Sequence, residues 1–180
     1  MDPLELYEHA SEWTKSKIEG AKGNLDSKTA CEEWTARDLI NHLLHGKELF
    51  VGAVEGKAPS GPPQGKPPEL LGDGDPVQAF EDVRQAVLGA FRKDGVLEDQ
   101  RNQMMAGIAF VDTLTHGWDL AKGTGQDTTM PPGLADAAMG AIGGQLTPER
   151  RGDSFKPEVE VPADASAQDK LIAYMGRQPN

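Results

Sequence analysis

Asp112 and His116 are the residues in this chain whose types and spacing most directly suggest chemistry. In a helix, side chains four residues apart project from the same face, about one turn from each other. The residues around this pair are mostly apolar, so the helix that carries it is expected to be buried. A buried carboxylate needs a partner, which is either the neighbouring histidine or a bound metal ion. The spacing alone leaves both interpretations open.

His42 lies in a second segment that has an apolar stripe of its own. At ~100° per residue, His42 falls inside that stripe, whereas His45 lies further round, at its polar edge. Two imidazoles and one carboxylate, with coordination positions left open, are the composition of a catalytic site for a divalent metal. The predicted metal ligands are therefore His42, Asp112 and His116. Zinc, nickel, iron and manganese all suit such a ligand set.

Three further residues near these positions have competing interpretations. Asp119 follows His116 by three residues and could orient it, act on a bound water or substrate, or cap the end of its helix. Trp118 projects elsewhere and is expected in the core. Cys31 precedes a helix N-terminus, where a thiol pKa is lowered. Because it has no adjacent base in the sequence, it is interpreted as structural.

Helical periodicity predicts the elements that must position these side chains. Thr35 and Asp38 have the spacing of a capping box, immediately before the segment that carries His42. The four main helices are predicted at residues 3–20, 36–54, 77–92 and 104–122. These lengths and spacings favour an all-α fold, an up-down four-helix bundle with one long crossover connection.

That connection is expected over residues 56–76, which are crowded with proline and glycine and hold almost nothing apolar. Such a segment cannot pack a core, so it is predicted to be a crossover loop, or a lid that covers the site.

The C-terminal part of the chain has a different pattern. A weaker helix is expected over 131–146, followed by a short extended segment around Phe155, Val159 and Val161 and a last helix over 167–175. The predicted domains are thus a metal-binding helical bundle over 1–146 and a small α/β appendage, a strand and a helix packed on the bundle, over 147–180.

Composition excludes several classes of protein. The net charge of −11 argues against a broad nucleic-acid-binding surface, which needs clustered lysine and arginine. No stretch approaches the ~20 apolar residues of a membrane-spanning helix, and no secretory signal is visible. The single cysteine rules out an intramolecular disulfide framework. We expect a cytoplasmic protein of ordinary core size that contacts neither nucleic acid nor a membrane.

Three segments resemble the mycothiol-dependent maleylpyruvate isomerase family, and more narrowly an actinobacterial branch of it within the DinB-like superfamily. They are Thr29-Ala-Cys-Glu-Glu-Trp34, Arg37-Asp-Leu-Ile-Asn-His42 and Asp112-Thr-Leu-Thr-His-Gly-Trp-Asp-Leu-Ala121. The tail also fits, with Phe155-Lys-Pro-Glu-Val-Glu-Val161 and Gly176-Arg177. The resemblance therefore covers nearly the whole chain.

The resemblance implies a DinB-like four-helix bundle that holds a divalent metal, often zinc or nickel, with three side chains. Carried over, its ligands fall on His42, Asp112 and His116, the same trio that the helical projection selects. The sequence departs from the characterised isomerase at the acidic ligand, which is glutamate there and the shorter aspartate here. The segment after the bundle is also short for a separate substrate-binding domain.

The leading hypothesis is a metal-dependent enzyme that uses a low-molecular-weight thiol, with mycothiol the first candidate, to isomerise or modify an electrophilic substrate. Asp119 or His45 would handle protons, and the sequence does not choose between them. One alternative is a metal-dependent hydrolase that uses bound water. Another is a non-catalytic binding or stress-response protein with a degenerate site. A homodimer formed through helix faces is compatible with each of these.

Overall fold

The computed structural model describes residues 1–31, 33–57, 65–151 and 155–179. The chain forms two compact units, Met1–Thr128 and Thr129–Asn180. Throughout the described ranges the regular structure is helical and no strand is assigned, so the all-α class expected from the sequence is confirmed. No helix in these ranges is long and apolar enough to cross a membrane.

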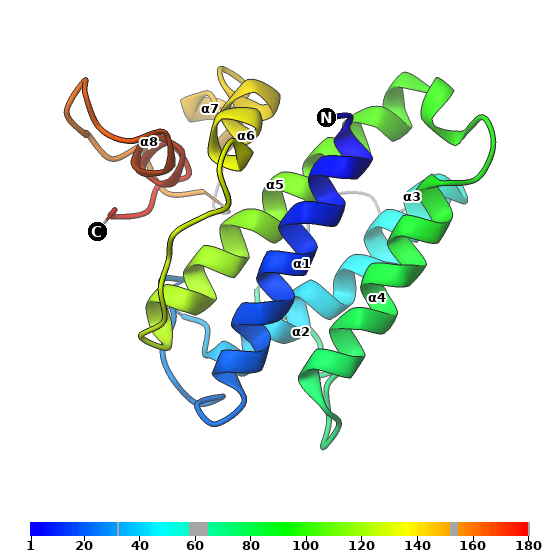
Figure 1. Ribbon diagram of the computed structural model, residues 1–180, viewed down its shortest axis with the longest axis horizontal. Helices are drawn as coiled ribbons and strands as arrows, with labels where there is room; N and C mark the ends of the chain where they lie inside the picture. Colours follow the sequence, from blue (N-terminus) through cyan, green and yellow to red (C-terminus); the bar gives the residue numbers. More distant parts are fainter. Residues whose placement is uncertain (32, 58–64, 152–154, 180) are drawn as a thin grey trace. The chain divides into compact units, whose positions relative to one another are not determined.

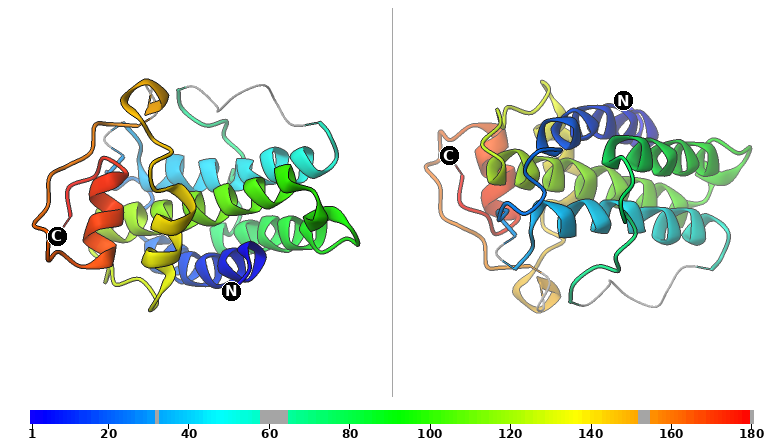
Figure 2. Two further views of the ribbon diagram at one scale, coloured as in Figure 1. Left: turned by 90° about the horizontal axis from the view of Figure 1, so that it is seen from above. Right: turned by 90° about the horizontal axis from the view of Figure 1, so that it is seen from below.

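The first unit is built on four long helices. These are α1 (Pro3–Ala21), α2 (Ala36–Gly46), α4 (Pro76–Phe91) and α5 (Gln100–Gly123). In Figures 1 and 2 they lie side by side, with α1 against α5 and α4, and α2 against α4 and α5. Because α5 contacts both α1 and α2, its middle is buried on most sides, as its all-round apolar sequence predicts.

The helices begin where local sequence signals place them. Thr35 and Asp38 form the predicted capping box: Asp38 N–H donates to Thr35 Oγ1 at 3.2 Å, and Thr35 N–H donates to Asp38 Oδ2 at 2.9 Å. Asp2 caps α1 in the same reciprocal way with Glu5. This pairing satisfies backbone donors that would otherwise lack a partner at a helix start. The start of α2, and with it the position of His42, is thus fixed locally.

The helix predicted over 36–54 is continuous but not uniform. After α2 the chain passes through a π-helical turn, η1 (Lys47–Val51), and returns to α-helix in α3 (Gly52–Val54). A π turn adds a residue to the helical period, so the apolar stripe beyond it rotates relative to α2. Phe50 and Ala53 remain buried on the far side of this turn. The plain 3.6-residue period expected here is therefore wrong at η1.

The connection between α3 and α4 is described from residue 65 onward; residues 58–64 of the predicted lid lie outside the described part of the chain. Its later portion is packed, since Leu71 is only 5% exposed. The side chain of Asn41 holds it: Leu70 N–H and Leu71 N–H each donate to Asn41 Oδ1 at 2.8 Å. The expectation that this segment contributes nothing to a core is wrong at Leu71. Because Asn41 precedes His42, the connection is anchored beside the predicted ligand.

The second unit contains α6 (Leu134–Ile142), α7 (Pro148–Arg151) and α8 (Ala167–Tyr174). The α6 helix packs on α8, and the Tyr174 hydroxyl donates to the Ile142 carbonyl at 3.1 Å. The structure therefore groups α6 with the C-terminal segment, whereas the sequence analysis places it with the bundle. The α/β character expected for 147–180 is not observed in the described residues. No strand is assigned around Val159, whose N–H donates to the Ala173 carbonyl at 3.0 Å.

Close packing of α1 on α5 positions the segment that carries Asp112 and His116. The Thr14 hydroxyl on α1 donates to the Thr113 carbonyl on α5 at 3.0 Å. At Gly117, a Cβ atom would clash with Thr14 Oγ1 and lie 2.8 Å from the Trp13 ring. Only glycine therefore allows this approach between the two helices.

Gly117→Ala and Gly107→Ala are expected to change stability in opposite directions. Both glycines lie in α5, but a Cβ at Gly107 meets no atom within 4 Å. Gly107→Ala should gain ~1 kcal/mol in helix propensity. Gly117→Ala gains the same but overpacks the helix contact, at a cost of ~1–3 kcal/mol, so we expect a net loss. Urea unfolding of both variants measures the difference; stabilisation by both would show that α1 and α5 are not packed this closely.

Candidate metal centre

Two neighbouring helices bring the predicted metal ligands together. His42 projects from α2, and Asp112 and His116 project from α5. The Nε2 atoms of His42 and His116 lie 3.3 Å and 3.4 Å from the same carboxylate oxygen, Oδ1 of Asp112. One donor atom from each residue lies within 4.8 Å of the other two. The aspartate thus reaches both imidazoles even though it is one methylene shorter than the glutamate of the characterised isomerase.

The donor set and its spacing fit a divalent cation. Bonds of ~2.0–2.2 Å from zinc to imidazole nitrogen and carboxylate oxygen fit between donor atoms at these separations. The Nδ1 atom of His42 is buried and has no hydrogen-bond partner among the residues that the structure describes. The ring of His42 is therefore oriented by Nε2, the atom that faces Asp112 and His116. Two imidazole nitrogens and one carboxylate oxygen are ligands that zinc and nickel accept.

Asp119 fixes the remaining nitrogen of His116. Its side chain is fully buried, and His116 Nδ1 lies 2.9 Å from Asp119 Oδ2. Because an ionised carboxylate only accepts hydrogen bonds, this contact places a proton on Nδ1. In the neutral imidazole, Nε2 then carries the lone pair, and Nε2 is the atom that faces Asp112. A carboxylate behind a histidine ligand is the usual arrangement around bound metals. The orienting contact considered for Asp119 is therefore present.

Charge and burial act against each other at this centre. Burial disfavours ionisation of Asp112, but electrostatic attraction to the His42 and His116 imidazoles and hydrogen bonds with them outweigh it and hold the pKa of Asp112 well below its usual range. Burial also disfavours a charged His116. Here the charge of Asp112, together with hydrogen bonds that the imidazolium donates to Asp112, Asp119 and Cys31, raises the pKa of His116 well above its usual range. Without a metal, Asp112 and His116 thus form an ion pair, and a bound cation would take the place of the proton between them.

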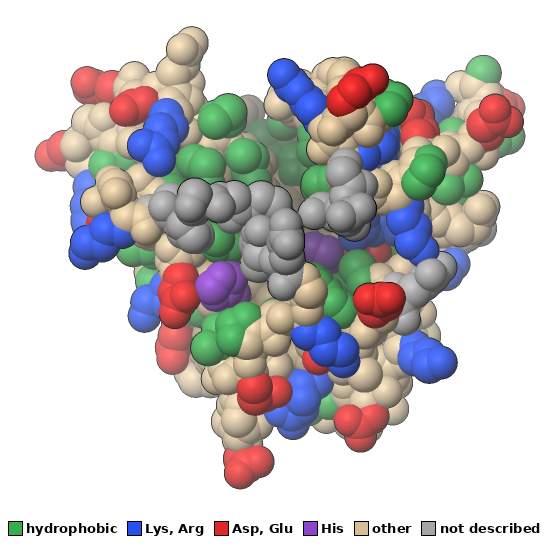
Figure 3. Space-filling model, turned by 180° about the vertical axis from the view of Figure 1, so that it is seen from behind, with side chains coloured by type: hydrophobic (Ala, Val, Ile, Leu, Met, Phe, Trp, Pro, Cys, Tyr) green, Lys and Arg blue, Asp and Glu red, His purple; other side chains and the backbone are tan. Residues whose placement is uncertain are grey.

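The centre is partly buried. The side chains of His42 and Asp112 remain 12% and 30% exposed, whereas Asp119 behind them is fully buried. Histidine side chains are visible on the face of the molecule shown in Figure 3, where one is recessed below its neighbours. Part of the His42 and Asp112 side chains therefore remains accessible to solvent.

Two residues beside the centre were not selected as site residues by the sequence analysis. The indole ring of Trp34 packs against both imidazoles, with ring centroids 5.1 Å from His42 and 6.1 Å from His116. The Sγ atom of Cys31 lies 3.2 Å from Asp119 Oδ2. Both precede the capping box of α2, and the motif Thr29–Trp34 already suggested that this segment matters.

The structure does not bring His45 into the same group. Its Nδ1 atom lies 3.3 Å from Glu48 Oε2, one turn further along the chain. His45 does not belong to the closely spaced group of His42, Asp112 and His116 in the described ranges. A role for His45 in proton transfer therefore stays a prediction.

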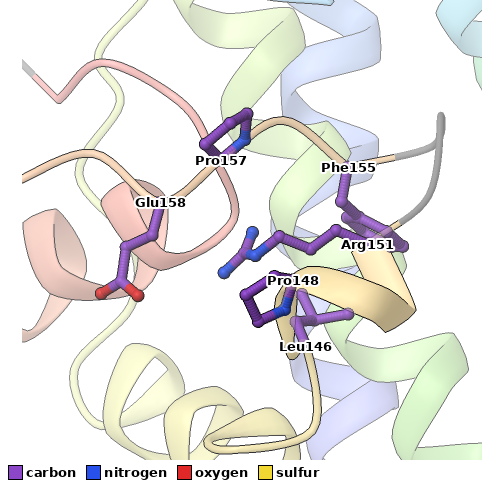
Figure 4. Close-up of a pocket in the computed structure, with 6 residues that line it drawn as sticks. All are labelled: Leu146, Pro148, Arg151, Phe155, Pro157 and Glu158. Atoms are coloured by element: carbon purple, nitrogen blue, oxygen red, sulfur yellow. The ribbon is translucent and has the colours of Figure 1, made fainter.

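A cavity of about 310 Å³ lies in the second unit. Figure 4 shows the side chains that line it, which are Leu146, Pro148, Arg151, Phe155, Pro157 and Glu158. Arg151 donates to the carbonyls of Lys156 at 2.9 Å and Tyr174 at 2.8 Å. Its guanidinium therefore links the backbone at these two positions. These lining residues offer no nucleophile and no set of metal ligands.

A family of known proteins matches the segment of the chain that contains the predicted metal ligands. The family model of the mycothiol maleylpyruvate isomerase N-terminal domain matches residues 16–121, a segment that contains all three predicted ligands and Asp119. Two uncharacterised proteins of Mycobacterium tuberculosis are each 31% identical over 182 residues, covering 98% of this chain and 98% of their own length. They are MT0763 of strain CDC 1551 and Rv0738 of strain H37Rv. No solved structure gives a significant match.

Proposed function

Because the chain belongs to the mycothiol maleylpyruvate isomerase N-terminal domain family, we propose that it is a metal-dependent enzyme that uses mycothiol as its cosubstrate. The reaction class is the transfer of the thiol to an electrophilic carbon, or an isomerisation that the thiol assists. The observation that carries this proposal is the convergence of His42 Nε2, His116 Nε2 and Asp112 Oδ1 at one partly buried point. In this proposal the four long helices form a DinB-like four-helix bundle.

His42, Asp112 and His116 would hold the divalent ion, zinc or nickel by the chemistry of the donor set. When bound, such an ion would supply the positive charge that lowers the pKa of a thiol and keeps it as the nucleophilic thiolate at neutral pH. The protein's own contribution is to hold the donor atoms in place before the substrate arrives. Asp119 does this for His116, and the packing of α2 on α5 does it for His42 relative to Asp112.

Other residues around the centre have separate roles in this proposal. The Trp34 ring covers one side of both imidazoles, which limits the directions from which water and substrate approach. Proton transfer falls to Asp119, which contacts a ligand directly, or to His45. Association into a homodimer and a cytoplasmic location belong to the same proposal.

An activity assay tests the proposal. Untagged protein, loaded with zinc or nickel, is incubated with mycothiol and either a conjugating electrophile (1-chloro-2,4-dinitrobenzene) or maleylpyruvate. We expect turnover that requires both thiol and metal and that falls at least ~100-fold when the metal is removed, because metal activation supplies several kcal/mol to such reactions. Turnover of an ester substrate without thiol would instead support a hydrolase. Metal-loaded protein that turns over neither substrate would support a binding protein.

A further inference from the structure

The segment that joins α1 to α2 is built tightly against the end of α5. Thr29 organises it: the Thr29 hydroxyl donates to the Trp34 carbonyl at 2.9 Å, and Trp34 N–H donates to the Cys31 carbonyl at 2.8 Å. On α5, a Cβ at Gly123 would lie 2.5 Å from the Lys28 carbonyl oxygen. The segment can therefore approach the helix closely only because residue 123 is glycine.

In this segment the Cys31 side chain contacts Asp119, the residue that orients the predicted ligand His116. Cys31 Sγ–H donates to Asp119 Oδ2 at 3.2 Å, the same oxygen that lies 2.9 Å from His116 Nδ1. Cys31 Sγ itself lies 3.9 Å from His116 Nδ1. Cys31, Asp119 and His116 thus form a chain of contacts that approaches the metal centre from the side opposite to Asp112.

We propose that Cys31 is a positioning residue for this centre, which acts through Asp119 to hold His116 with Nε2 toward the metal. The proposal rests on the metal centre of the proposed function, and not on its thiol chemistry. A carboxylate with one donor can rotate about that contact, whereas two donors on the same oxygen, from two different segments, restrict it. Outer partners of this kind change metal affinity ~10–100-fold in other proteins when they are removed.

The alternative is that Cys31, which is partly exposed, only fills space as a small hydrophobic side chain. The two roles predict opposite effects from two substitutions of similar size. Serine keeps a hydrogen-bond donor and loses hydrophobicity, whereas valine keeps the volume and hydrophobicity and loses the donor. A positioning residue tolerates serine and not valine. A packing residue tolerates valine and not serine.

The test compares Cys31→Ser and Cys31→Val with the unaltered protein. Zinc affinity is measured by competition with a chromophoric chelator, and the exchange rate of the His116 Nδ1 proton with water is measured by NMR. We expect zinc affinity within ~3-fold of the unaltered protein for Cys31→Ser and ~10-fold weaker for Cys31→Val, with faster proton exchange only in Cys31→Val. Urea unfolding of the metal-free proteins separates these effects from changes in global stability.

Every other pattern overturns the proposal. Equal zinc affinity in the three proteins, or weaker binding only in Cys31→Ser, would leave Cys31 a packing residue. Failure of the unaltered protein to bind zinc would remove the centre itself. Loss of the thiol reaction alone, with the expected order of zinc affinities, would contradict the proposed function but not the role of Cys31.

Discussion

Replacement of His42 or His116 by alanine is expected to abolish stoichiometric metal binding, whereas replacement of His9 or His45 should leave it unchanged. The chain has four histidines, so this set of variants tests every one of them. His42 and His116 point their Nε2 atoms at Asp112, whereas His9 is exposed and His45 faces Glu48. Loss of a direct ligand should cost more than the ~10–100-fold in affinity that loss of an outer partner costs.

Elemental analysis of untagged protein measures this result, with circular dichroism to show that each variant folds. The fluorescence of Trp34 provides a second measurement. Because its ring lies against both imidazoles, this fluorescence should be quenched when Ni²⁺ binds. Trp34→Phe should remove the quenching but keep the metal. Retention of one metal per chain by folded His42→Ala or His116→Ala would show that the ion binds elsewhere.

The proximity of His42, Asp112 and His116 could be predicted from the sequence because its signals are local. The i,i+4 spacing of Asp112 and His116 fixes their shared face in any helix, and the helix itself follows from its apolar residues. To place His42 beside this pair, one must also predict that α2 packs on α5. The position of His42 inside an apolar stripe of its helix predicts this packing. The structure then gives the separations that no periodicity can give, including the two contacts to Asp112 Oδ1.

The support around the ligands could not be predicted in the same way. Trp34 and Cys31 lie in a segment without helical period, whose path depends on hydrogen bonds made by Thr29 and on the missing side chain of Gly123. The Gly123 contact joins residues far apart in the sequence, and the hydrogen bonds of Thr29 and Trp34 close a turn with no helical or strand period, so no periodicity reports either of them. An alternation of apolar residues around Val159 likewise favours a strand, but a strand also needs a partner, and Val159 makes only one backbone hydrogen bond of that kind.

Zinc is expected to stabilise the protein by an amount that increases with pH between about 6.5 and 8.5, while the metal-free protein loses stability over the same range. In the metal-free protein the pKa of His116 is raised by Asp112, Asp119 and Cys31, so His116 is charged at neutral pH. Zinc must displace the proton on Nε2 of His116. Binding should therefore release close to one proton per chain at pH 7.

The signs follow from the direction of each pKa shift. Because the pKa of His116 is higher in the folded chain than in the unfolded chain, its contribution to stability is complete below the unfolded pKa of ~6.5 and is lost as pH rises through the folded value. The pKa of Asp112 is lowered, so its contribution is lost only as pH falls toward that value. Of these two groups, only His116 therefore changes charge as the pH rises above neutrality.

The expected size is large enough to measure by thermal unfolding. Zinc present at 1,000 times its Kd stabilises the folded state by ~4 kcal/mol. Release of one proton makes the affinity up to ~10-fold tighter per pH unit, which adds ~1.4 kcal/mol per unit at a fixed zinc concentration. Calorimetric titration in two buffers that differ in ionisation enthalpy counts the protons released on binding.

His116→Ala is the matched control for this prediction, because it removes both the proton and a ligand. It should release no proton and should lose the decline in metal-free stability above neutral pH. Asp112 in that variant still has the His42 imidazole 3.3 Å away, so its behaviour at low pH should largely persist. If zinc stabilised the unaltered protein equally at pH 6.5 and pH 8.5 without releasing a proton, His116 would not be a metal ligand, and the ion pair with Asp112 would be its only role.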